Sequence, residues 1–189
     1  QDNEINALFV DPTTFKIYVA AGKNLAISDD NADSWQTVPP LAGRNSNPIS
    51  SIYAAGNTIF TPKLMPGGLD YVEFNNGSYS AKLISNSDIS LLTDIFASKD
   101  GSRIYVSSRI KGLIISKDHG VNWQEIHPNN KTFVNYISAS DDGQLICAVD
   151  SKEIVISIDE GATWRVLSTS VGSFHSDDAM IGKIYVSPA

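Results

Sequence analysis

Short apolar stretches, separated by Gly, Asp and Asn, recur along the whole chain at a nearly constant spacing. Aligned on one apolar stretch per repeat, the steps are 41, 46, 41 and 39 residues, measured between Tyr18, Ile59, Tyr105, Ile146 and Tyr185. The stretches are short and rich in β-branched and aromatic residues, which is typical of strands. No segment has a convincing 3.6-residue periodicity, so we expect little helix.

Each repeat can be divided into four strands, which we call A to D. In the third repeat, the pattern predicts strands at residues 92–97, 104–107, 112–116 and 123–126. A repeat of about 40–45 residues with four strands is typical of a propeller blade. A lone blade cannot bury both of its faces, so the blades must stack around an axis.

We therefore predict an all-β fold, a β-propeller of four-stranded antiparallel blades, with four recognisable blades and a two-strand partial fifth. All of it forms one domain, residues 1–189. The approximate blades are residues 5–45, 46–88, 89–131 and 132–173, with the partial fifth at 174–189.

The three tryptophans end related octets at residues 28–35, 116–123 and 157–164, each reading Ser-x-Asp-x-small-x-polar-Trp. Trp123 and Trp164 are 41 residues apart, whereas Trp35 and Trp123 are 88 apart, which is two repeats. The missing octet is expected at residues 73–80, which keep Gly77 but lack the Ser and the Trp.

These octets resemble Asp-box repeats, also called BNR repeats, of the sialidase-like β-propellers. That superfamily includes sialidases, some xyloglucan hydrolases and the sortilin ectodomain. The third octet matches the family pattern Ser-x-Asp-x-Gly-x-Thr-Trp completely, whereas Ala32 replaces Gly in the first and Asn122 replaces Thr in the second. The resemblance covers nearly the whole chain and implies the propeller fold.

The chemistry of the octet points to a structural role in the turn between strands C and D. The Asp can accept hydrogen bonds from backbone N–H groups of its own turn, and the Trp can pack between neighbouring sheets. Gly at the fifth position allows a positive φ. The predicted structural residues are Ser28, Asp30, Trp35, Ser116, Asp118, Gly120, Trp123, Ser157, Asp159, Gly161, Thr163 and Trp164.

Composition narrows the class of protein further. The chain has 189 residues, a formal net charge of −7 and a single cysteine, Cys147. That is enough for a hydrophobic core, and it excludes an internal disulfide. The acidic balance argues against nucleic-acid partners, and no apolar run is long enough to insert in a membrane. The chain begins with Gln1 and not Met, and we predict a secreted or periplasmic location.

The sialidase pattern that the resemblance implies uses three arginines to clamp a carboxylate. The four arginines of the chain are Arg44, Arg103, Arg109 and Arg165. Arg165 belongs on an outer strand, and Arg103 belongs on the face opposite the expected pocket. Two arginines cannot make the triad, so we do not expect a sialidase and assign no catalytic residue.

A glycosidase that uses two carboxylates stays open as the alternative. Its candidate residues are Asp94 on an inner strand, together with Asp70, Asp88 and Asp150. The three histidines lack metal-ligand spacing, and the octets lack the ligand set of a calcium loop, so neither metal nor cofactor is expected.

Blade topology places the B–C and D–A loops on one side of the propeller, which is the usual ligand side of the superfamily that the octets resemble. We predict that this side binds a partner, either a protein or a glycan, without catalysis. Its candidate residues are Arg44, Lys63, Leu64, Met65, Arg109, Lys111, Lys131 and Lys152. Completion of the partial fifth blade by another chain would make an oligomer.

Overall fold

The structure is a computed structural model, and it describes residues 4–38, 48–62, 69–75, 78–84, 91–150, 153–167 and 184–186. Within these residues the chain forms four separate antiparallel sheets of four strands each. In the part of the chain that the structure describes, helix is limited to a single 3-10 turn at Pro128–Asn130. The predicted all-β fold of four-stranded antiparallel blades is therefore confirmed.

The blades follow one another along the chain. Blade 1 contains β1 (Ile5–Val10), β2 (Ile17–Ala21), β3 (Asn24–Ser28) and β4 (Gln36–Val38). Blade 2 contains β5 (Tyr53–Ala55), β6 (Thr58–Pro62), β7 (Leu69–Asn75) and β8 (Ser78–Ile84). Blade 3 contains β9 (Leu92–Ala97), β10 (Ile104–Ser108), β11 (Gly112–Ser116) and β12 (Gln124–Ile126). Blade 4 contains β13 (Tyr136–Ala139), β14 (Ile146–Val149), β15 (Ile154–Ser157) and β16 (Arg165–Val166).

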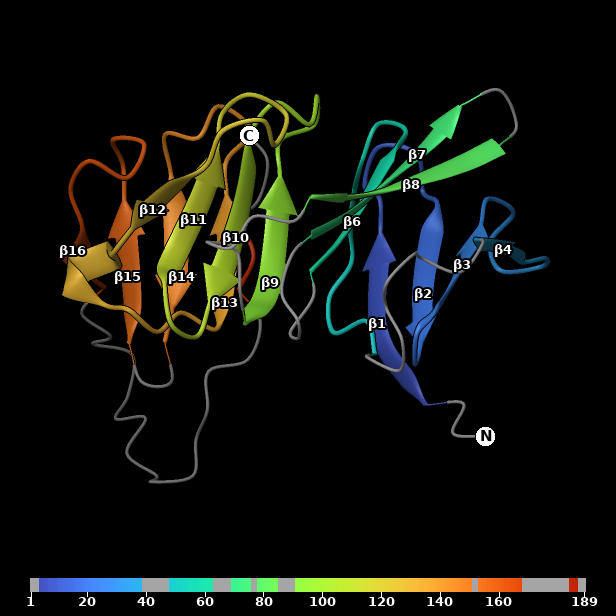
Figure 1. Cartoon of the computed structure of the whole chain (residues 1–189), viewed down its shortest axis with the longest axis horizontal. Helices are drawn as coiled ribbons and strands as arrows, with labels where there is room; N and C mark the ends of the chain where they lie inside the picture. Colours follow the sequence, from blue (N-terminus) through green and yellow to red (C-terminus); the bar gives the residue numbers. More distant parts are fainter. Residues whose placement is uncertain are drawn as a thin grey trace.

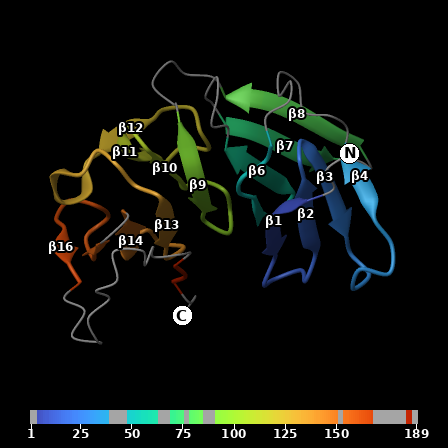
Figure 2. The ribbon, with the colours of Figure 1, turned by 90° about the horizontal axis from the view of Figure 1, so that it is seen from below.

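The four sheets stand side by side in an arc, with blade 1 at one end and blade 4 at the other (Figures 1 and 2). Each sheet keeps its strands in chain order, so consecutive strands pair as hairpins. The first strand of each blade lies toward the inside of the arc, as β9 and β13 show through their contacts with each other. This places the turns between first and second strands close together in space.

Alternation along the strands gives every blade two apolar faces. We call the face toward the preceding blade the upstream face and the face toward the next blade the downstream face. Tyr18 and Ile27 on the downstream face of blade 1 pack against Ile59 and Val72 on the upstream face of blade 2. Two further buried clusters join blade 2 to blade 3 and blade 3 to blade 4. No buried cluster of described residues joins blade 4 back to blade 1.

Blade 2 differs from the prediction at residues 73–80, where a fourth octet was expected. Instead, β7 and β8 pair continuously, and the ladder runs out to Asn75 opposite Ser78. Residues 73–80 lack the Ser that starts an octet and have Asn75 at its Asp position. Without the hydroxyl and carboxylate that gather N–H groups in a wide turn, the backbone groups pair across the hairpin.

The predicted partial fifth blade is described only at residues 184–186, and the rest of 174–189 lies outside the described residues. Residues 184–186 were expected to form a strand, and they belong to none of the four sheets. They lie against the downstream face of blade 4, where the N–H of Val186 donates to Ser138 Oγ at 2.9 Å.

Candidate functional site

The three octets are closed turns whose polar atoms bond to one another. In blade 4, Ser157 Oγ donates to Asp159 Oδ1 at 2.7 Å and accepts the N–H of Gly161 at 2.8 Å. The same carboxylate accepts the N–H of Thr163 at 2.9 Å and its hydroxyl at 2.5 Å. These bonds favour the ionised form and lower the pKa of Asp159 to about 2, the bond from the Thr163 side chain being the largest cause. Both oxygens of the Asp159 carboxylate therefore accept hydrogen bonds from residues of the same octet.

The octets of blades 1 and 3 repeat this arrangement. Asp30 Oδ1 accepts the N–H of Ser34 at 2.9 Å, and Asp118 Oδ1 accepts the N–H of Asn122 at 2.8 Å. The fifth position has a positive φ in all three turns, at 72° for Ala32, 81° for Gly120 and 87° for Gly161. Ala32 shows that the turn forms even without glycine. The three octets thus share one set of hydrogen bonds and one backbone conformation.

The carboxylates considered for glycosidase chemistry have structural partners. Asp94 on β9 is buried, and its carboxylate accepts the Ser51 hydroxyl at 2.6 Å and the N–H of Ile137 at 3.3 Å. Asp94 therefore links blade 3 to blade 4 and to the segment that leads into blade 2. Asp150 accepts Lys131 Nζ at 2.5 Å and the N–H of Glu153 at 2.7 Å. Asp70 is buried on β7, and Asp88 lies outside the described residues.

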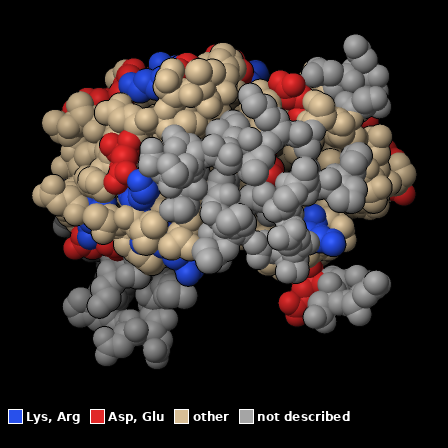
Figure 3. Space-filling model, in the orientation of Figure 1, with Lys and Arg blue, Asp and Glu red and all other residues tan. Residues whose placement is uncertain are grey.

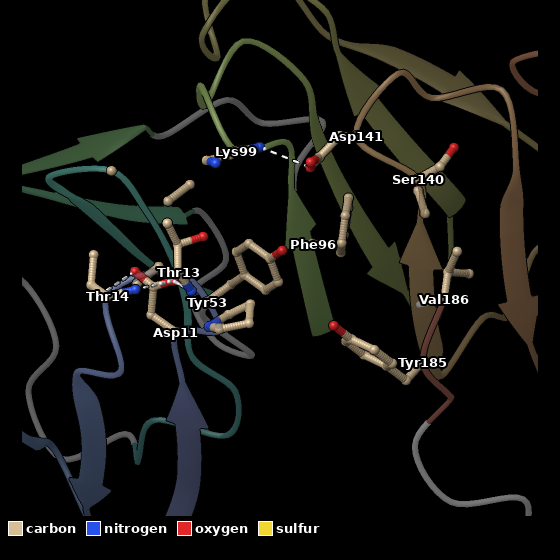
Figure 4. Close-up of a pocket in the computed structure, with 15 residues that line it drawn as sticks. Asp11, Thr13, Thr14, Tyr53, Phe96, Lys99, Ser140, Asp141, Tyr185 and Val186 are labelled. Carbon is tan, nitrogen blue, oxygen red and sulfur yellow. Dashed lines mark hydrogen bonds between the residues drawn. The ribbon is translucent and has the colours of Figure 1, made fainter. Parts of the chain in front are cut away.

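A cavity of about 420 Å³ lies where the first strands of the four blades converge. Its walls come from the turn after β1 (Asp11 to Thr14), from Tyr53 on β5, from Phe96 on β9, and from Ser140 and Asp141 after β13. Tyr185 and Val186 complete it on the blade 4 side (Figure 4). All four blades contribute, so we call this the axial cavity. Its volume falls within the range of small-molecule sites.

Aromatic rings form one wall of the axial cavity. The ring of Tyr53 lies between those of Phe9 and Phe96, with centroids 4.7 and 4.9 Å away. Burial raises the pKa of Tyr53 well above its usual range, and the charge of Asp141 adds to the effect. The phenol therefore stays protonated at neutral pH. Tyr185 is 68% exposed and presents a second phenol on the blade 4 side.

Charged and hydroxyl groups line the part of the axial cavity formed by turns. The Asp11 carboxylate accepts the N–H of Thr13 at 2.8 Å and the Thr14 hydroxyl at 2.6 Å. Across the cavity, Asp141 Oδ1 accepts the N–H of Lys99 at 3.0 Å (Figure 4). The site thus combines aromatic surface with fixed carboxylates, the Lys99 side chain and threonine hydroxyls.

Sequence reasoning missed the axial cavity because it looked for sites on the opposite side, among the B–C and D–A loops. A usable signal was present, since the propeller prediction already placed strand A of every blade beside the axis. Tyr53 and Phe96 lie on these strands, and Asp11 and Asp141 lie in the turns that follow β1 and β13. Aromatic residues on the strands beside the axis would have indicated a ligand cavity with aromatic walls.

The predicted loop face is described only in part. Arg44, Lys63, Leu64, Met65 and Lys152 lie outside the described residues. Arg109 is exposed in the turn between β10 and β11. Lys111 Nζ lies 3.2 Å from Glu125 Oε2, and Lys131 Nζ lies 2.8 Å from Glu153 Oε2. The hydrogen bond that Lys131 Nζ donates to the Asp150 carboxylate is the largest cause of the raised pKa of Lys131.

These ion pairs leave a mixed surface. Figure 3 shows basic and acidic side chains side by side over β11 and β12. The binding role of this face stays a prediction. Among the described residues, no helix has the length and hydropathy to cross a membrane.

Comparison with known proteins gives the fold its wider context. No model of a known protein family matches the chain, and no curated protein matches its sequence. Among solved structures, a GH74 enzyme of Niastella koreensis superposes on 87% of the chain with a TM-score of 0.68 and 16% identity. A chain in the nidogen/laminin complex superposes on 88% with a TM-score of 0.73 and 13% identity. The fold is that of a β-propeller.

Hydrazine synthase of Kuenenia stuttgartiensis superposes on 87% of this propeller with a TM-score of 0.65 and 14% identity. At these identities the likeness shows the fold alone. This propeller spans 24% of the GH74 chain, 65% of the chain in the nidogen/laminin complex and 49% of the hydrazine synthase chain.

Proposed function

We propose that this chain is a non-catalytic binding propeller that recognises a glycan, and that the axial cavity holds one sugar unit. The observation that carries the proposal is the lining of the cavity, in which the aromatic rings of Tyr53, Phe96 and Tyr185 adjoin the carboxylates of Asp11 and Asp141. Aromatic rings pack against the apolar face of a sugar ring, and carboxylates accept hydrogen bonds from its hydroxyls.

The way in which the two carboxylates are held favours binding over catalysis. A glycosidase needs one carboxylic acid that donates a proton and a second carboxylate that attacks or activates water. Asp11 accepts bonds from its own turn, and Asp141 holds the backbone of Lys99. These bonds suit groups that keep the turns in place and orient a ligand.

Two other functions stay open as alternatives. One is a carbohydrate-active hydrolase that uses a carboxylate pair, and the solved structures with this fold include a GH74 enzyme. The other is recognition of a protein partner on the face of Arg109, Lys111 and Lys131, and another structure with this fold is a chain of the nidogen/laminin complex. We further propose that the octets are Asp-box repeats, on the strength of their shared hydrogen bonds, and that the protein acts outside the cytoplasm.

A glycan array followed by titration calorimetry tests the proposal. The cavity variant combines Tyr185→Ala with Lys99→Ala. Both changes should leave the fold intact, because Tyr185 is largely exposed and the N–H with which Lys99 bonds Asp141 belongs to the backbone. The matched control, Arg109→Glu with Lys111→Glu, alters the opposite side. We expect at least a tenfold loss of glycan affinity in the cavity variant and an unchanged affinity in the control.

The reverse pattern would contradict the cavity as the site and support the predicted loop face. A parallel screen of chromogenic glycosides tests the hydrolase. Turnover by the unmodified protein would overturn the non-catalytic assignment, and the absence of turnover alongside glycan binding is the expected result.

A further inference from the structure

The upstream face of blade 1 has the register of a blade–blade interface, but no sheet formed by the described residues lies against it. In blade 3 the cross-strand set Ile95, Val106 and Ile114 faces blade 2, and each side chain is 2% exposed or less. The matching set of blade 4, which is Ile137, Ala148 and Val155, is at most 1% exposed.

The equivalent set of blade 1 is Leu8, Val19 and Ala26, which are cross-strand partners in the same order. Here Leu8 is 59% exposed, and Val19 and Ala26 are only half-buried. Val10, one pair further along β1, is 46% exposed. The strand pairing is therefore that of an interface, but none of the four described sheets covers it.

The octet tryptophans show that the outer edge of blade 1 is uncovered as well. Trp123 packs on the cluster between blades 2 and 3, and Trp164 packs on the cluster between blades 3 and 4. Trp123 and Trp164 therefore lie at the interface between their own blade and the preceding one. Trp35 occupies the same position in blade 1 and is 44% exposed.

The opposite end of the arc exposes the matching positions at its rim, whereas Ser138 on β13 is buried and accepts the N–H of Val186. Ile126, at the end of the last strand of blade 3, packs on the same cluster as Trp164. Its equivalent in blade 4, three residues after the octet Trp, is Leu167, which is 40% exposed. Ile158 in the octet and Tyr185, over the same face, are 64% and 68% exposed.

We propose that the upstream face of blade 1 binds the downstream end of blade 4 from a second copy of the chain. The contact would place Leu167 of one copy against Trp35 of the other, as Ile126 lies with Trp164 within the chain. Both halves of the interface are present once per chain, at opposite ends. Such a head-to-tail contact either closes into a ring or continues into a longer assembly.

Light scattering after size exclusion, over a range of protein concentrations, tests the contact. For the full chain we expect the mass to rise from 20.4 kDa to twice that value or a higher multiple. Leu8→Asp removes the upstream half and Leu167→Asp the downstream half, so each variant alone should stay at 20.4 kDa. The matched control is Val121→Asp. Val121 is 75% exposed on the octet of blade 3, away from both proposed halves, so this variant should associate as the unmodified chain does.

Mixing separates this contact from other pairings. Each variant keeps one intact half, so an equimolar mixture of Leu8→Asp and Leu167→Asp should recover twice the chain mass. If Leu167→Asp associates on its own, the proposal is wrong, because that result indicates a symmetric contact between two blade 1 faces. A full chain that stays at 20.4 kDa at every concentration would overturn it as well. Val10→Lys and Ile158→Lys repeat the test if either aspartate variant loses its circular dichroism signal.

Discussion

The octets of blade 1 and blade 4 have the same turn but different surroundings. In both, the Ser hydroxyl donates to the Asp carboxylate, at 2.8 Å for Ser28 and 2.7 Å for Ser157. Yet Trp164 lies within a cluster that includes Ile126, whereas Trp35 is 44% exposed. The turn is therefore formed by its own eight residues, and the burial of its tryptophan is supplied by the preceding blade.

This difference separates local from tertiary stabilisation. Changes within the turn should act similarly in the two blades, and changes to the tryptophan should act mainly in blade 4. The octet thus stabilises the fold through the bonds of its own turn and through the packing of its tryptophan, and in blade 1 only the turn bonds are complete.

The largest effect is expected for the tryptophans. Trp164→Ala removes a large side chain from the interface between blades 3 and 4 and should cost about 3 kcal/mol of unfolding free energy. Trp35→Ala should cost about 1 kcal/mol or less, because its side chain already contacts water. Chemical denaturation of the two variants below the concentration of self-association measures both values. Equal losses would contradict the comparison.

The fifth octet position gives the next effect, with opposite signs in the two blades. At Gly161 a Cβ atom would lie 3.3 Å from Ile126 Cδ1, and φ is +87°, so Gly161→Ala should destabilise by about 1–2 kcal/mol. Ala32 already has a φ of +72°, so Ala32→Gly should stabilise by a few tenths of a kcal/mol. Thermal melts measure both changes, and a loss of stability in Ala32→Gly would contradict this reasoning.

The octet carboxylates should respond to acid alike in the two blades. Hydrogen bonds, chiefly from the Ser34 and Thr163 side chains, lower the pKa of Asp30 and Asp159 to about 2. A carboxylate with a lowered folded-state pKa stabilises the fold above its unfolded value of about 3.9, and this contribution is lost as the pH falls toward 2. Carboxyl carbon NMR titration should give both groups a midpoint near 2. A midpoint near 4 for Asp30 alone would show that its turn depends on the missing neighbour.

The smallest effect is expected at the octet position that follows the Asp. Glu160 Oε2 lies 2.7 Å from Lys117 Nζ and so links the octets of blades 3 and 4. The hydrogen bond from Lys117 and its charge are the main causes of a lowered pKa of Glu160. Glu160→Gln should lower the melting temperature slightly, and high salt should remove the difference. Asn31, at the equivalent position of blade 1, is uncharged and has a φ of +59°, which Asn adopts more readily than Gln, so any effect of Asn31→Gln should be the same at low and high salt.

Much of the fold could be predicted from the sequence because the blade is a local unit. The predicted strands at residues 92–97 and 112–116 coincide with β9 and β11. The octets were predictable because their bonds join residues at most four apart, as between Asp159 and Thr163. The hairpin of β7 and β8 was not predicted, because residues 73–80 were interpreted as a weak octet although β7 and β8 form a continuous ladder there.

The candidate site was harder to predict because it depends on contacts between blades. Asp11 and Asp141 are 130 positions apart in the sequence and line one cavity only because four blades bring their first strands together. Likewise, the burial of Asp94 follows from Ser51 and Ile137, on either side of it in the arc. No spacing rule within one repeat contains this information.

The central claim is that Trp35 lies on an interface that no sheet of the described residues covers, and fluorescence quenching tests it most directly. Two proteins are needed, one that keeps Trp35 alone (Trp123→Phe with Trp164→Phe) and one that keeps Trp164 alone (Trp35→Phe with Trp123→Phe). With acrylamide, and at a concentration where the chain is a single copy, we predict a quenching constant several-fold larger for Trp35. Equal constants for the two tryptophans would contradict the account.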